Sequence, residues 1–361
     1  MPGRSRSIDI AVVGGGPAGA ICALMLARSG AHVSLMHWGG YAASGIELVS
    51  GRARHLIEHY SPDFFQKASL GVEVHETLSL WGTPEPVIFN AMFNPWGAGV
   101  AVERPLFDRA LRHLACTEGV SVIDDAKVVR IERSKDQWHL LMRSAGTVGD
   151  EAGSHASARF LVLATGRAAA QFVDRSPVAE PSGIALMTFL QTPGSGRVQS
   201  PGNRLYVEGR DNGWWYALPA RDGSHFAGFC TDREEVKKRR GSLKEFFVRE
   251  LRGTRLLAPL LSTAPGNLQI SGRMAGAQAF DRISGEGWIA VGDAAYAPDP
   301  LSGMGIELSI ESAQLGAHAL LKAKQGSTHS PALMGFAEYE DAIRERVGRQ
   351  EKTAAYHYGR L

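Results

Sequence analysis

The stretch Ile10–Val33, IAVVGGGPAGAICALMLARSGAHV, decides the fold of this chain. A short apolar run leads into Gly14, Gly16 and Gly19 at G-x-G-x-x-G spacing, and a small-residue helix follows that ends near Gly30. This order predicts a strand, a tight turn, a helix and a second strand. The first glycine permits the turn, the second lets backbone N–H groups reach a pyrophosphate, and the third lets helix and strand pack closely. An ordinary glycine-rich turn is the alternative, but the flanking elements favour a dinucleotide site.

Length and composition predict an ordinary globular protein. The 361 residues, 44% of them hydrophobic, can bury the core of one large unit or of two interleaved domains. The formal charge is only +2, so the sequence lacks the strong positive charge that is typical of nucleic-acid-binding proteins. Cys22, Cys116 and Cys230 are widely spaced, which predicts no metal site and suits a reducing compartment. The basic N-terminus precedes an apolar run that glycines interrupt, so we expect neither a signal peptide nor a membrane segment, and a cytoplasmic protein.

Two kinds of sequence pattern alternate along the rest of the chain. Phe160–164 and Trp288–291 are wholly apolar, as expected of buried parallel strands. Residues 73–102 alternate apolar and polar side chains with frequent turn residues, which predicts antiparallel strands, and residues 183–230 are also predicted to form sheet. Residues 47–60 are predicted to be helical. The predicted domains are a nucleotide-binding domain over 1–72, 103–182 and 271–361, and a substrate domain over 73–102 and 183–270.

A second signal follows the last apolar strand. Asp293 at the end of that strand is placed to accept a hydrogen bond from a ribityl or ribose hydroxyl, although a helix-capping aspartate is the alternative. The sequence PLSGMG comes shortly after it and leads into a helix. The N-terminus of that helix carries partial positive charge, which suits the negative charge of a reduced flavin ring.

These motifs together resemble a known family. The glycine fingerprint, Arg104-x-x-Phe107-Asp108, LATGR at 163–167 and the GD…P…G-x-G block at 292–305 are similar, in order and over the whole chain, to the FAD-dependent class A monooxygenases. The resemblance implies an α/β fold, in which a Rossmann-like FAD-binding domain of the GR2 or p-hydroxybenzoate hydroxylase type is interleaved with an antiparallel-sheet substrate domain. The expected cofactor-binding residues are Gly14, Gly16, Pro17, Ala18, Gly19, His37, Arg104, Gly166, Asp293, Pro300, Gly303, Met304 and Gly305.

A narrower resemblance is carried by WGTPE at 81–85, FNPWG at 93–97 and GWWYALP at 213–219. These runs are similar to the tryptophan-halogenase-like branch, which includes flavoproteins that mature tryptophylquinone cofactors in partner enzymes. Halogenases carry W-x-W-x-I-P, whereas Tyr216 replaces the second tryptophan here. Halogenases also use a lysine, and this chain has none from 68 to 126, where it is expected. Both departures argue against halogenation.

Other positions depart from the family or stay open. His37 stands where the family has an acidic ribose ligand, and Tyr296 and Glu307 replace the usual histidine and asparagine. The substrate-side candidates are Trp96, Trp214 and Tyr216, although aromatic residues in strands are more often core. The sequence nominates no catalytic acid or base.

The resemblance implies an FAD-dependent oxidoreductase, specifically a monooxygenase. NAD(P)H is the expected transient reductant, O2 the oxygen source and an electron-rich aromatic ring the substrate. The preferred substrate is a tryptophan side chain of a partner protein, hydroxylated during biogenesis of a quinone cofactor. The alternatives are a monooxygenase or halogenase of a free small aromatic, a flavin-dependent prenyl reductase, and a maturation factor without turnover.

Overall fold

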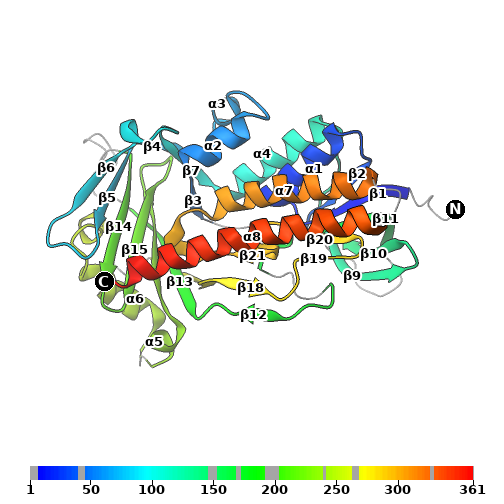
Figure 1. Ribbon diagram of the computed structural model, residues 1–361. Coiled ribbons are helices and arrows are strands. Elements are labelled where there is room, and N and C mark those ends of the chain that lie inside the picture. Colours follow the sequence, from blue (N-terminus) through cyan, green and yellow to red (C-terminus); the bar gives the residue numbers. More distant parts are fainter. Residues whose placement is uncertain are drawn as a thin grey trace.

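A mostly parallel sheet lies at the centre of the half that contains the glycine-rich turn (Figure 1). The computed structural model describes residues 7–39, 45–144, 153–167, 172–191, 203–238, 241–261, 268–325 and 329–360. Strand β1 pairs in parallel with β2 and β11, β2 pairs in parallel with β8, and β11 pairs in parallel with β20. The sheet contains β19 (Ser284–Gly285), β20 (Trp288–Ala290), β11 (Ser154–Leu163), β1 (Ser7–Val13), β2 (Val33–Met36) and β8 (Ser121–Ile123), with β9 (Ala126–Ser134) and β10 (Gln137–Ser144) as an antiparallel extension. Segments from the start, middle and end of the chain therefore lie side by side.

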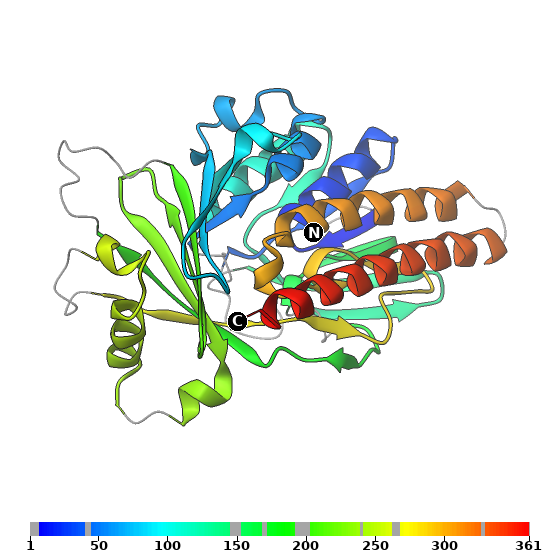
Figure 2. The same cartoon turned by 60° about the vertical axis from the view of Figure 1, so that its left-hand side comes forward.

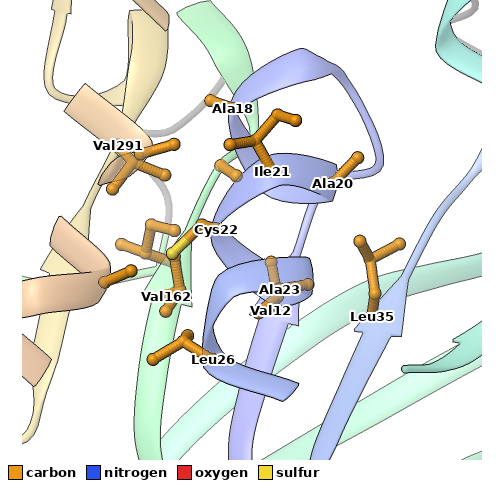
Figure 3. Packing of buried hydrophobic residues seen from close by; sticks show 14 of the residues in the cluster. Val12, Ala18, Ala20, Ile21, Cys22, Ala23, Leu26, Leu35, Val162 and Val291 are labelled. Atoms are coloured by element: carbon orange, nitrogen blue, oxygen red, sulfur yellow. The ribbon is translucent and has the colours of Figure 1, made fainter. Parts of the chain in front are cut away.

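Helix α1 (Pro17–Arg28) packs on this sheet and on α7 (Gly305–Gln325). Its alanines and glycine allow close approach, while Ile21, Leu24 and Leu26 are almost completely buried. Figure 3 shows Val12, Leu35 and Val162 of the sheet around this helix. Truncation of one such leucine to alanine costs about 2–5 kcal/mol, so α1 is an integral part of the core. The remaining helices of this half are α4 (Arg104–Thr117) and α8 (His329–Tyr358).

A larger antiparallel sheet forms the other half. Its strand order is β17-β13-β16-β15-β14-β5-β6, with one parallel pair between β14 and β5. The strand predicted at residues 213–219 is confirmed: Trp214 and Tyr216 lie in the core on one face of the sheet, whereas Trp215 packs in a separate core on the other face. The elements are β5 (Glu76–Leu80), β6 (Val87–Asn90), β13 (Gly183–Leu190), β14 (Arg204–Arg210), β15 (Gly213–Pro219), β16 (His225–Asp232), β17 (Ser271–Ala275), α5 (Arg233–Lys237) and α6 (Leu243–Arg252).

Two small sheets join the halves. One has the order β3-β7-β4 and the other β12-β18-β21. The helix predicted over 47–60 is wrong in its first part, because Ile46–Val49 pairs with β7, and α2 begins only after Ser50, whose hydroxyl caps it. The elements are β3 (Ile46–Val49), α2 (Gly51–Glu58), α3 (Phe64–Lys67), β4 (Val72–Val74), β7 (Gly99–Glu103), β12 (Pro177–Ala179), β18 (Gln278–Phe280), β21 (Tyr296–Ala297) and the short 3-10 turns at Ala91–Phe93, Ala258–Leu260, Gly292–Ala294 and Pro300–Ser302.

The predicted α/β architecture, with a Rossmann-like layer and an antiparallel sheet, is confirmed. Strands β5 and β6 from residues 73–102 join the sheet formed by residues 183–275, so that the chain crosses between the two layers more than once. The division into two domains at the stated boundaries stays a prediction. None of the helices in the described ranges has the length and apolarity needed to cross a bilayer.

Candidate cofactor and substrate site

One side of the glycine turn packs tightly against other backbone atoms, and its other side faces open space. Gly14 has a φ of +114°, and a Cβ at this position would lie 2.1 Å from the carbonyl oxygen of Ala164. A Cβ on Gly19 would lie 1.9 Å from the carbonyl oxygen of Gly14. A Cβ on Gly16 would meet nothing within 4 Å, and Pro17 then starts α1. The first N–H groups of α1, which have no intrahelical acceptor, therefore face open space.

The first and last sequence motifs touch each other. Gly292 has a φ of +64°, and a Cβ there would lie 2.7 Å from the Cβ of Ala18 in α1. The N–H of Gly292 donates to the hydroxyl of Ser312 in α7 at 2.7 Å. At the start of α7, a Cβ on Gly303 or Gly305 would meet nothing within 4 Å. The structure therefore brings together two helix N-termini whose glycines leave room for a ligand.

Asp293 lies next to this junction with 34% of its side chain exposed. Burial raises the pKa of its carboxyl, while the guanidinium of Arg167, 3.8 Å away, lowers it. Arg167 donates to the carbonyl oxygens of Gly276, at 2.8 Å, and Pro298, at 3.2 Å. These contacts fix the strands on both sides of the aspartate, so its carboxyl is held at the edge of the sheet.

His37 directly follows β2 and lies beside the glycine turn. Burial and repulsion by Arg112 lower the pKa of its imidazole, against the weaker pull of Asp124 and Asp125. A Cβ on Gly15 would lie 2.8 Å from the Cβ of His37, and Arg112 donates to the carbonyl oxygen of Gly15 at 3.0 Å. A neutral imidazole both donates and accepts a hydrogen bond, so this position keeps the means to bind a ribose hydroxyl.

Arg104 begins α4 and is held between two carboxylates. It donates to Glu47 at 2.8 Å and, through two nitrogens, to Asp108 at 3.1 Å. Burial lowers the pKa of Arg104, but the attraction of the two carboxylates outweighs this effect and the pKa lies above its usual value. Glu47 also raises the pKa of Asp293, and Arg104 lowers it. Arg104 thus belongs to the same group of charges as Asp293.

The loop that leads into α7 is anchored from two sides. Asp299 caps the turn that starts at Pro300, by accepting from the N–H of Leu301 at 2.9 Å. The side-chain amide of Gln350 in α8 donates to the sulfur of Met304 at 3.2 Å. Both contacts fix the backbone around Gly303 and Gly305.

Glu307, on the first turn of α7, is a fixed link to α2. The hydroxyl of Ser50 donates to its carboxylate at 2.6 Å, and Arg52 donates at 2.9 Å. The acid that replaces the family's asparagine therefore has a structural partner on each side. It ties the start of α7 to the helix that follows β3.

The aromatic cluster of the larger antiparallel sheet consists of Trp81, Trp214 and Tyr216. The ring centroid of Trp214 lies 6.2 Å from the ring centroid of Trp81 and 5.8 Å from that of Tyr216. Burial raises the pKa of the Tyr216 hydroxyl. Trp96 is not part of this cluster: it is 46% exposed and packs against His55 at 5.1 Å. The structure therefore unites two of the three substrate-side candidates and separates the third.

The end of α8 lies next to the larger antiparallel sheet (Figure 2), and its last residues contact the aromatic cluster. The indole N–H of Trp214 donates to the hydroxyl of Tyr358 at 3.2 Å, and this hydroxyl donates to Asp299 at 3.0 Å. The indole N–H of Trp81 donates to the carbonyl oxygen of His357 at 2.9 Å. A Cβ on Gly82 would lie 2.3 Å from the carbonyl oxygen of Arg360. The last turn of α8 thus joins the larger antiparallel sheet to the loop before α7.

Sequence reasoning missed two residues of this site, Arg112 and Tyr358. Arg112 stands four residues after Asp108 and eight after Arg104, so helical spacing already indicated that the three share one side of α4. Tyr358 had no such signal, because it contacts a residue 144 positions away in the chain.

The residues present fit the flavin dinucleotide that the sequence implies. Three glycines at 16, 303 and 305 leave space where a Cβ would touch nothing, in front of two helix N-termini. The hydroxyl of Thr165 is buried and has no hydrogen-bond partner among the described residues. The next residue, Gly166, has a φ of +62° and also faces space. An unpaired hydroxyl beside an open glycine indicates a ligand group at this point.

Comparisons with known proteins agree with this geometry. The chain is 27% identical over 332 residues to LodB of Marinomonas mediterranea, whose name places it among FAD-dependent oxidoreductases; the match covers 88% of this chain and 85% of the relative. It is also 27% identical to a tryptophan 2-halogenase of Chondromyces crocatus, over 86% of this chain and 60% of the halogenase. No protein-family model matches.

Solved structures with the same fold include the chondrochloren halogenase CndH, with a TM-score of 0.84 and 22% identity over 98% of this chain and 82% of that one. The peptidyl tryptophan dihydroxylase QhpG, essential for tryptophylquinone cofactor biogenesis, aligns with a TM-score of 0.79 and 24% identity over 98% of this chain and 75% of that one. The predicted resemblance to the tryptophan-halogenase-like FAD monooxygenases is confirmed. So are the predictions of an oxidoreductase and of FAD as its cofactor.

Proposed function

We propose that this chain is an FAD-dependent monooxygenase that hydroxylates a tryptophan side chain of a partner protein during quinone cofactor biogenesis. The similarity to QhpG supports the substrate class, since that protein is a peptidyl tryptophan dihydroxylase. The observation on this chain that carries the proposal is an exposed apolar patch on β6 and the turn after it. Ile88, Phe89, Met92 and Phe93 in this patch are 56%, 60%, 78% and 82% exposed.

The patch suits a protein substrate better than a free metabolite. β6 lies at one end of the strand order of its sheet, so part of its backbone is left for pairing with another chain. The same hairpin carries Trp81 of the aromatic cluster, directly after β5. Contiguous exposed apolar surface of this kind marks a protein contact. We therefore assign the outer face of this hairpin, residues 87–96, to partner binding.

The reaction inserts one oxygen atom of O2 into an aromatic C–H bond and releases the other as water, with NAD(P)H supplying two electrons. The bound flavin supplies the redox chemistry, and the protein binds and orients the substrate and shields the reaction from water. In this assignment the first turns of α1 and α7 hold the negatively charged parts of the cofactor, and Asp293 accepts from one of its hydroxyls. The site residues named from the sequence are proposed cofactor ligands in this sense.

Halogenation is disfavoured by the same two departures that the sequence presents, Tyr216 and the stretch without lysine. The decisive experiment supplies the FAD-loaded protein with NADH or NADPH, ¹⁸O2 and a quinone-enzyme precursor, and then maps the precursor by mass spectrometry. We expect ¹⁸O on a tryptophan. Incorporation into a free aromatic acid but not into the precursor contradicts the protein substrate, and reduction without any incorporation contradicts monooxygenation.

A further inference from the structure

A small cavity lies between the loop before α7 and the last turns of α8. Its volume is about 170 Å³, and its polar lining comes from Tyr296, Asp299, Ser302, Gln350 and Glu351, with two alanines completing it. Pockets that hold a drug-sized ligand measure about 300–1,000 Å³. The space therefore suits one aromatic ring rather than a whole dinucleotide.

Tyr296 and Gln350 supply buried polar groups to this cavity. Tyr296 is 9% exposed, and the side-chain oxygen of Gln350 is buried and has no hydrogen-bond partner among the described residues. Burial and the two nearby carboxylates, Glu351 and Asp299, raise the pKa of Tyr296 to about 12, so the phenol is neutral at physiological pH. A buried amide oxygen without a partner is costly unless a ligand or water donates a hydrogen bond to it.

The other groups around the cavity are mainly acceptors. Glu351 has no ion-pair partner in the described part of the chain, whereas Asp299 already accepts from Leu301 and Tyr358. Arg167, the cation that acts on Tyr296, donates to backbone carbonyls behind the wall. A ligand that fits here is therefore a ring that carries an N–H donor, because the buried side-chain oxygen of Gln350 and the carboxylates of Asp299 and Glu351 are all acceptors.

We propose that this cavity receives the indole ring of the substrate, whose N–H donates to the carboxylate of Glu351. The inference rests on the proposed function and names the place where the tryptophan side chain binds. Asp299 and Ser302 in the wall belong to the loop that carries Pro300 and Gly303, so the ring lies against the loop assigned to the flavin.

The charge of the cavity also suits the reaction. When an oxygen atom adds to a carbon of the indole, the ring carries positive charge until the proton on that carbon leaves. The carboxylates of Glu351 and Asp299 stand where they stabilise this charge. The same groups disfavour an anionic aromatic, so the cavity discriminates against benzoate-like substrates.

The test compares two probes on the FAD-loaded protein by isothermal titration calorimetry: N-acetyl-L-tryptophanamide and the same compound methylated on the indole nitrogen. The wild type is expected to bind the N–H compound about tenfold more tightly than the methylated one. Glu351→Gln is expected to remove most of this difference. Glu345→Gln, on the same helix but paired with Arg349 at the surface, is the matched control and leaves it unchanged.

Tyr296→Phe provides a second variant, with an expected loss of affinity for both probes and an unchanged preference for the N–H compound. Equal binding of the two probes by the wild type, no binding of either, or an unchanged preference in Glu351→Gln overturns the cavity assignment. These outcomes are separate from the proposed function, which the ¹⁸O experiment tests. If ¹⁸O enters the precursor while the probes bind equally, the cavity assignment fails and the function stands.

Discussion

The hydroxyl of Tyr358 lies 3.2 Å from the indole nitrogen of Trp214 and 3.0 Å from a carboxylate oxygen of Asp299, so one side chain connects the larger antiparallel sheet to the loop before α7. Tyr358→Phe is expected to lower the free energy of unfolding by about 0.5–1.5 kcal/mol, because two hydrogen bonds are lost while the ring remains. Urea denaturation of the FAD-loaded protein measures it. Tyr356→Phe, two residues earlier and 60% exposed, is the control, and an equal loss in both variants contradicts the special position of Tyr358.

The glycine turn predicts opposite outcomes for two alanine substitutions. Gly19→Ala places a Cβ 1.9 Å from a backbone oxygen, so the protein without cofactor is expected to lose about 1–3 kcal/mol or more. Gly16→Ala meets no protein atom and is expected to keep that stability while weakening FAD binding at least tenfold, because the methyl group occupies the space assigned to the pyrophosphate. Thermal unfolding and fluorescence titration with FAD separate the two effects. Unchanged FAD affinity in Gly16→Ala would contradict the pyrophosphate assignment.

We expect the contributions of Arg104 and Asp108 to stability to be strongly coupled, because the two side chains are paired and that of Asp108 is only 13% exposed. Arg104→Gln leaves this carboxylate without its cation and is expected to cost about 3–5 kcal/mol. The double variant Arg104→Gln, Asp108→Asn removes the uncompensated charge and is expected to recover part of the loss. Chemical denaturation of the four proteins in this cycle measures the coupling, and additive effects refute it.

We expect Asp293 to make the stability of the folded protein depend on pH, in a direction that follows from its raised pKa. Because burial raises its pKa in the folded state, its contribution to stability is complete below about pH 4 and is lost as the pH rises through the folded-state value. In the protein without cofactor, Asp293→Asn is therefore expected to gain stability relative to the wild type between pH 4 and pH 7. Melting temperatures of both proteins across this range provide the measurement. A difference that stays constant with pH would show that this carboxyl does not titrate abnormally.

The apolar patch predicts a loss of binding without a loss of folding. Phe93→Ser, at a side chain 82% exposed, is expected to leave the melting temperature unchanged and to weaken capture of the quinone-enzyme precursor several-fold. Val178→Ser removes an apolar side chain on β12 that is 66% exposed and serves as the control. Pull-down with the immobilised precursor compares them, and equal capture by both variants argues against this surface.

The sequence predicted those features that rest on local geometry. The glycine spacing predicted the turn and its packing, and the apolar runs at 160–164 and 288–291 predicted the buried parallel strands. The aromatic run at 213–219 correctly predicted a strand. Each of these depends on neighbours within a few residues.

Features that depend on distant partners were not predictable. Ile46–Val49 became a strand because β7 offers a pairing edge 51 to 57 positions further along, which overrode its helical spacing. Trp96 was grouped with Trp214 by residue type, yet its loop carries it to His55 instead. Tyr358 could be placed only once the sheet and the end of α8 were seen together.

The contact between Gly292 and Ala18 has a consequence for how the protein is made. The first glycine motif leaves the ribosome long before residue 292, and at about 5–20 residues per second the interval is roughly 15–55 seconds. During that time α1 lacks the strand and the helix against which it packs. Nascent chains therefore expose the apolar flank of α1, and cofactor capture waits until synthesis is nearly complete. In the cell, flavin thus binds the completed chain rather than the growing one. This binding stabilises the folded state.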